Sequence, residues 1–110
     1  MSEESLPPIA ARVSRDFPDV WAAYNQLGRA AATAGPLDAK TQRLIKLALA
    51  AGAKLEGAVH AHTRRGLEEG VSPEELRHVA MLAITTLGWP SAMAVLTWIE
   101  DVAGKPDSPG

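Results

Sequence analysis

Apolar residues recur along the chain with the three- and four-residue spacing of α-helices. This pattern predicts five helices, at residues 18–35, from 38 to about 54, through the histidines to 70, at 72–87, and from 91 onward. The second contains the run LIKLALAAGA, which is apolar nearly all round and predicts a helix buried on several sides. The sequence therefore predicts an all-α protein.

Polar residues and prolines mark where these helices begin. Pro18 suits the first turn of a helix because its φ is fixed near the helical value. Asp38 is a suitable N-cap. Ser72 and Glu75 form the capping-box pattern before the fourth helix, and the run Gly88–Pro90 separates that helix from the fifth.

The length of 110 residues fits one domain, with a helical core over about 16–103 and flexible termini at 1–8 and 104–110. Short helices with this much apolar surface are difficult to bury in one small monomer. A symmetric homo-oligomer would cover the excess. A tightly packed monomeric bundle is the alternative.

Charge and residue usage exclude several classes of function. The net charge is −2 with both signs interspersed, which argues against a nucleic-acid partner. Lys46 interrupts the longest apolar stretch, so no membrane span is predicted. The first residues lack the layout of a secretory signal, and we expect a cytoplasmic protein. The chain has no cysteine, which excludes disulfides, thiolate metal sites and sulfur nucleophiles.

Two histidines, at 60 and 62, lie in the third helix. Residues two apart on a helix differ by about 200°, so the two side chains point to nearly opposite faces and cannot bind one metal from one helix. His62 shares a stripe with Val59 and Gly66, which predicts a core-facing position that favours a neutral, proton-accepting imidazole. A buried histidine bonded to a backbone carbonyl is the alternative.

His60 lies on a different row, with Glu56 one turn before it and Arg64 one turn after. A carboxylate at this spacing can hydrogen-bond to the imidazole and raise its pKa. The row indicates either a functional Glu–His pair or a solvated row of ion pairs.

The run GPLDAKTQRLIKLALAAGAKLEGAVHAHTRRGLEEGVSPEELRHVAMLAITTLGWPSAM resembles the carboxymuconolactone decarboxylase and alkylhydroperoxidase-D-like superfamily, over about residues 36–102. The matching features are the L-D-x-K-T-x-x-L helix start, the helix-breaking segment that follows, and the H-T-R-x-x-L-E-x-G and G-V-S-P-E-E-L runs. The resemblance implies a compact all-α bundle of five to six helices, assembled as trimers or hexamers with active sites near subunit contacts.

The departures from this superfamily restrict its chemistry. Peroxidase members carry a C-x-x-C motif, a histidine four residues later and a glutamate on the preceding helix. The resemblance places Leu55 and Ala58 at the cysteine positions, Arg43 at the glutamate and His62 at the histidine. Without a thiol the peroxidase cycle is excluded. Decarboxylase members resemble this chain in having a histidine at the position of His62. They differ in having a glutamate where this chain has Ala58, and basic residues where it has Leu55 and His60.

With the histidine retained, the resemblance implies a decarboxylase- or isomerase-type enzyme that acts on a small organic acid without a cofactor or metal. His62 is the predicted general acid or base, with His60 and Glu56 assisting across a subunit contact. Arg43 or Arg65 is predicted to hold the substrate carboxylate.

Other interpretations of the same residues stay open. Trp89 and Trp98 are candidates to line a pocket, although tryptophans at helix junctions are usually packing residues. A non-catalytic oligomeric binding or scaffold protein is one alternative. A metal held by His60, His62 or His78 from different subunits is another.

Overall fold

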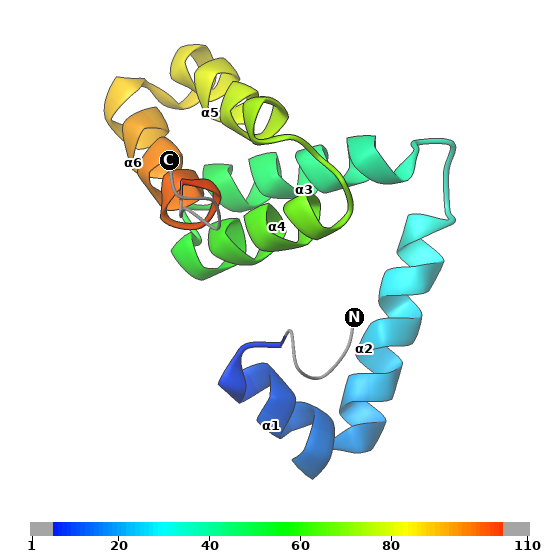
Figure 1. Cartoon of the computed structure of the whole chain (residues 1–110). Coiled ribbons are helices and arrows are strands. Elements are labelled where there is room, and N and C mark those ends of the chain that lie inside the picture. The colour runs from blue at the N-terminus through cyan, green and yellow to red at the C-terminus, as the bar shows by residue number, and fades with distance from the viewer. Residues whose placement is uncertain (1–5, 105–110) are drawn as a thin grey trace. The chain divides into compact units, whose positions relative to one another are not determined.

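A computed structural model describes residues 6–104, and six α-helices follow one another along this part of the chain (Figure 1). The residues group into two units, 1–36 and 37–110, each described by itself below. The all-α prediction is confirmed. Expectations for residues 1–5 and 105–110 lie outside the described residues.

The first unit contains α1 (Pro8–Asp16) and α2 (Pro18–Ala32). Helix α1 is absent from the sequence prediction, which placed a flexible terminus at 1–8 and the start of the core at about 16. Pro8 lies in the first turn, where proline is compatible with a helix, and Arg12 pairs with Asp16 at 3.2 Å one turn later. Helix α2 begins at Pro18 as predicted.

The second unit contains α3 (Ala39–Gly52), α4 (Glu56–Glu68), α5 (Pro73–Leu87) and α6 (Trp89–Ala103). Helix α4 packs against both α3 and α6, and α5 packs against α6. Their inward side chains, with Val71 from the connection between α4 and α5, form one buried apolar cluster; the helical members are Leu47, Ala50, Ala51, Val59, Leu76, Ala80, Val95 and Ile99. This core fixes α4, the histidine helix, from both sides.

The predicted start signals of the second unit are confirmed. Asp38 accepts a hydrogen bond from the Thr41 backbone N–H at 2.8 Å. Ser72 accepts from the Glu75 N–H at 3.1 Å, and the Ser72 N–H donates to the Glu75 carboxylate at 2.9 Å. That backbone hydrogen bond, followed by Lys40 at 2.9 Å, lowers the pKa of Glu75 to about 2.

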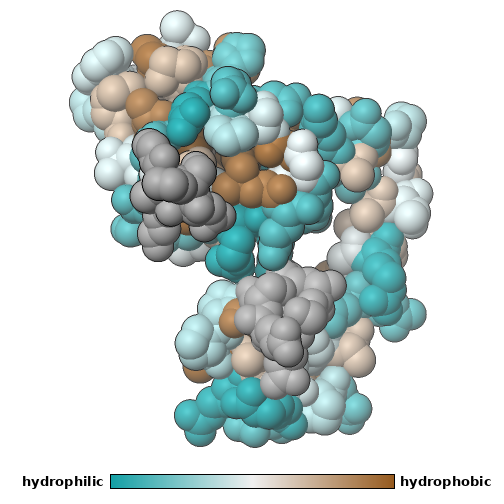
Figure 2. Space-filling model, in the orientation of Figure 1, coloured by the Kyte–Doolittle hydropathy of each residue, from teal (hydrophilic) through white to brown (hydrophobic). Residues whose placement is uncertain are grey.

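The junction between α5 and α6 is tighter than predicted. Gly88 alone separates the two helices, with φ at +94°, and α6 begins at Trp89 rather than at Ser91. Pro90 is accommodated because it lies in the first turn, where its missing N–H has no helical acceptor. Figure 2 shows apolar side chains at the surface among polar ones where α5 runs into α6.

None of the helices within residues 6–104 is both long enough and apolar enough to cross a membrane.

Candidate functional site

His62 lies on α4, partly buried, with its ring beside a side chain of α3. Its Nδ1 atom is 2.7 Å from Nη1 of Arg43. A guanidinium has donors only, so Arg43 donates to Nδ1 and the neutral ring carries its proton on Nε2. Gly66, one turn after His62, packs closely against Leu76 and Arg43: a Cβ there would lie 3.2 Å from the Leu76 Cδ2 and 3.4 Å from the Arg43 Cγ.

The surroundings of His62 hold it in the neutral form at pH 7. Its pKa is lowered to about 4, first by burial and then by the positive charges of Arg43, Arg65 and Lys46. This agrees with the neutral imidazole expected from the sequence. A neutral ring among cationic groups suits a negatively charged ligand.

Arg43 is itself fixed by a carboxylate at the end of α4. Its Nε and Nη2 atoms donate to the two oxygens of Glu69, at 2.9 and 2.8 Å, and its side chain is only 13% exposed. The hydrogen bond from Arg43 lowers the pKa of Glu69. Arg43, His62 and Glu69 therefore form one connected group. The positive charge of Arg65 nearby lowers the pKa values of both His62 and Glu69.

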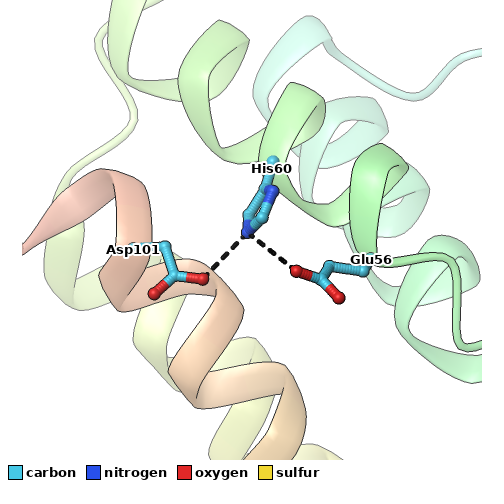
Figure 3. Close-up of side chains that lie close together, drawn as sticks. All are labelled: Glu56, His60 and Asp101. Atoms are coloured by element: carbon cyan, nitrogen blue, oxygen red, sulfur yellow. Dashed lines mark hydrogen bonds and ion pairs between the residues drawn. The ribbon is translucent and has the colours of Figure 1, made fainter.

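His60 belongs to a second group, on the side of α4 that faces α6 (Figure 3). Its Nε2 atom lies 3.0 Å from a carboxylate oxygen of Asp101 on α6 and 3.9 Å from one of Glu56. The predicted proximity of Glu56 is present, but Asp101 is the closer partner. No sequence signal pointed to Asp101, because it lies 41 residues away and nothing in its own helix shows which face of α4 it meets.

The row of His60 is not simply solvated. Arg64, one turn after His60, has its Nε and Nη2 atoms buried without a hydrogen-bond partner among residues 6–104. The hydroxyl of the fully buried Thr63 also has none. Of the two interpretations of the row Glu56–His60–Arg64, the solvated row of ion pairs therefore does not fit Arg64, because part of its guanidinium is buried.

The remaining predicted site residues lie elsewhere. In the part of the chain that the structure describes, Trp89 joins neither group; it is the first residue of α6 and is 62% exposed. His78 lines an apolar groove of about 500 Å³ between α3 and α5, together with Thr41, Glu75 and a row of leucine, isoleucine, valine and alanine side chains. His62 does not line this groove.

Comparison with known proteins supplies the family. Residues 18–101 match the model of the carboxymuconolactone decarboxylase family. An uncharacterised protein of Methanocaldococcus jannaschii is 30% identical over 92 residues, which cover 84% of this chain and 86% of that protein. An uncharacterised protein of Haemophilus influenzae is 42% identical over 50 residues, or 46% of this chain and 44% of that protein. The chain belongs to the carboxymuconolactone decarboxylase family.

Proposed function

We propose that this protein is a cofactor-free acid/base enzyme of the lyase or isomerase type, acting on a small organic acid at His62. The observation that carries the proposal is the neutral imidazole of His62 with its Nδ1 lone pair bound by Arg43, beside the cationic groups of Arg65 and Lys46. An imidazole that is neutral near pH 7 has the protonation state that a proton acceptor needs. The nearby cations suit a substrate that brings a carboxylate.

The contact with Arg43 gives the substrate carboxylate a direct role. While Arg43 donates to Nδ1, the lone pair of His62 cannot accept a proton. A bound carboxylate is a stronger acceptor for the guanidinium than a neutral imidazole, because both partners are charged. Engagement of Arg43 by the substrate would therefore free Nδ1 at the moment when the substrate is in place.

The proton balance defines two related reactions. In an isomerisation, Nδ1 takes a proton from one carbon of the substrate and the imidazolium returns it to another. In a decarboxylation, the bond to the departing CO₂ breaks and its electron pair enters the conjugated system of the substrate. Nδ1, once released by Arg43, takes a proton from water and passes it to the resulting carbanion, so that this proton replaces CO₂ on the carbon. Acid/base participation by a positioned histidine contributes about 10²- to 10⁴-fold in rate.

The family resemblance supports the same position for the reactive histidine, and family membership supports a decarboxylase-like protein. His60 and Glu56, predicted to assist, lie in the separate group with Asp101, so the proposal rests on His62 and Arg43. Trp89 is left out because it joins neither group.

We also propose that the protein is a homo-oligomer, a trimer or a hexamer. Three large apolar side chains of the second unit, Ile45, Leu49 and Leu82, are 40%, 67% and 62% exposed and would be covered by a second copy. Light scattering after size exclusion measures the mass of the assembly and tests this proposal.

Exchange of substrate protons with deuterium tests the reaction class even while the natural substrate is unidentified. A panel of small keto, unsaturated and lactone acids is incubated in D₂O with the protein, and loss of C–H signals or release of CO₂ is followed by NMR. We expect turnover of at least one member, abolished in His62→Gln and unchanged in the matched control His78→Gln. Arg43→Gln should raise KM more than it lowers kcat.

The same panel gives a binding measurement that separates a wrong substrate from a wrong site. A carboxylate that engages Arg43 must move the ring resonances of His62, because the two side chains are in contact. Turnover that survives His62→Gln, or ring signals of His62 that no carboxylate shifts, contradicts the proposal. A non-catalytic binding protein, the alternative interpretation, would shift the signals without turnover.

A further inference from the structure

We infer that Glu56, His60 and Asp101 form a binding site for a divalent transition-metal ion, separate from the group around His62. The three side chains converge from two helices, α4 and α6, that pack directly on each other (Figure 3). One ligand atom from each lies within 4.8 Å of the others. This inference does not depend on the reaction proposed at His62.

The spacing along α4 places two of the ligands correctly. Glu56 and His60 are four residues apart, so they lie one above the other on the same face of the helix. An i, i+4 pair is one arrangement by which a single helix offers two ligands to one metal. Asp101 adds the third ligand from α6, and its contact with His60 is the shorter at 3.0 Å.

The distances require only small movements to receive an ion. Zinc binds histidine nitrogen and carboxylate oxygen at about 2.0–2.2 Å, so neighbouring ligand atoms in a tetrahedral site are about 3.3 Å apart. The observed separations from the His60 Nε2 atom are 3.0 Å to Asp101 and 3.9 Å to Glu56. The side chains of Asp101 and Glu56 are 48% and 58% exposed and can rotate, while the imidazole is 30% exposed and held between the helices.

The charges of the same three side chains support the site as well. The Nε2 atom of His60 carries at most one proton, which can be donated well to one carboxylate, here Asp101. Glu56 is left at 3.9 Å, beyond hydrogen-bond distance, although it brings a second negative charge to the same nitrogen. A proton satisfies one of these carboxylates, whereas a divalent ion in its place would satisfy both.

The donor set selects the class of metal. An imidazole nitrogen with two carboxylate oxygens suits zinc, cobalt, nickel or copper, while magnesium and calcium prefer oxygen ligands alone. Three protein ligands leave a coordination position open to the solvent. An ion here would link α4, the histidine helix, directly to α6.

Calorimetric titration with ZnCl₂ tests the site on untagged protein that has been treated with a chelator and dialysed. We expect saturable binding of one ion per chain, weakened about tenfold or more in His60→Gln, Glu56→Gln and Asp101→Asn. His78→Gln and His62→Gln are the matched controls and should bind as the unchanged protein does. Visible absorption of bound Co²⁺ reports coordination directly, and circular dichroism verifies that each variant is folded.

Asp101→Asn distinguishes a metal site from a simple ion pair between the helices. The amide oxygen still accepts a hydrogen bond from His60, so this variant retains the contact but loses a charged ligand. Absence of saturable binding to the unchanged protein overturns the inference. So does binding that is lost in His62→Gln or His78→Gln while His60→Gln and Asp101→Asn retain it.

Discussion

Lowering the pH from 7.5 to 5 should destabilise this protein through His62. In the unfolded chain the imidazole takes up a proton near its ordinary pKa of 6.5, whereas burial and then Arg43 lower the folded pKa to about 4. Between these values the unfolded state binds more protons than the folded state, so the free energy of unfolding falls as the pH falls. The contribution of the neutral His62 to the free energy of unfolding is fully present above about pH 6.5 and is lost as the pH falls toward 4.

The size of this loss follows from the two pKa values. One pH unit within the window corresponds to about 1.4 kcal/mol, so the fall from 6.5 to 5 removes at most about 2 kcal/mol. Because His62 is only partly buried, solvent screening reduces the expected loss to about 1 kcal/mol. Carboxylates that are common to this protein and to a His62 variant contribute equally to both, so the difference between the two proteins isolates the histidine.

Urea unfolding of the unchanged protein and of His62→Gln at pH 7.5, 6.5, 6 and 5 isolates the contribution of this residue. The glutamine cannot titrate, yet its amide oxygen can still accept from Arg43. The difference in stability between the two proteins should shift by about 1 kcal/mol across the series, always to the disadvantage of the histidine at low pH. Parallel pH profiles for the two proteins would show that the folded His62 titrates as it does in the unfolded chain.

Three further predictions concern the framework of the second unit. Ser72→Ala removes the side-chain acceptor of the Glu75 N–H and should cost about 1 kcal/mol in urea unfolding; an unchanged midpoint would contradict the capping box. Leu76→Ala should cost about 2–5 kcal/mol because the side chain is fully buried. Leu37→Ala, at a position that is 52% exposed, should stay within about 0.5 kcal/mol, and equal losses in the two variants would refute this core assignment. Gly88→Ala places a side chain on a backbone with φ of +94° and should lower the free energy of unfolding by about 1–2 kcal/mol. An unchanged urea midpoint would show that the turn between α5 and α6 does not have this backbone conformation.

Local signals in the sequence were sufficient for five of the six helices. Asp38 and the Ser72–Glu75 box act within three residues, so their hydrogen bonds can be predicted from spacing alone. Helix α1 was missed because Pro7 and Pro8 indicate a turn or a frayed end as readily as a helix start. The start of α6 was placed two residues late for a similar reason, since Trp89 and Pro90 directly follow a glycine.

The two site groups differ in how far they could be predicted. Helical periodicity separated His60 from His62, and Glu56 was identified because it lies on the same helix as His60. Asp101 could not be found, because its contact with His60 depends on how α6 packs against α4 and no motif encodes that packing. The bond between Arg43 and His62 likewise joins two helices. Only the family resemblance pointed to Arg43, as the residue that replaces a glutamate.

An arginine at the position that the resemblance assigns to a glutamate reverses the charge beside His62. A carboxylate at this position would favour the imidazolium, because an opposite charge nearby raises the pKa of a histidine. Arg43 lies 2.7 Å from the ring and has the reverse effect, adding to burial in keeping the ring neutral. The Nδ1 atom of His62 can accept a proton only after Arg43 has found another acceptor for its Nη1 group. Glu69 already accepts from the Nε and Nη2 donors of the same guanidinium, so this new acceptor must come from elsewhere. Under the proposed function, a substrate carboxylate that takes over the Arg43 contact would therefore be both the ligand that is recognised and the event that activates the base.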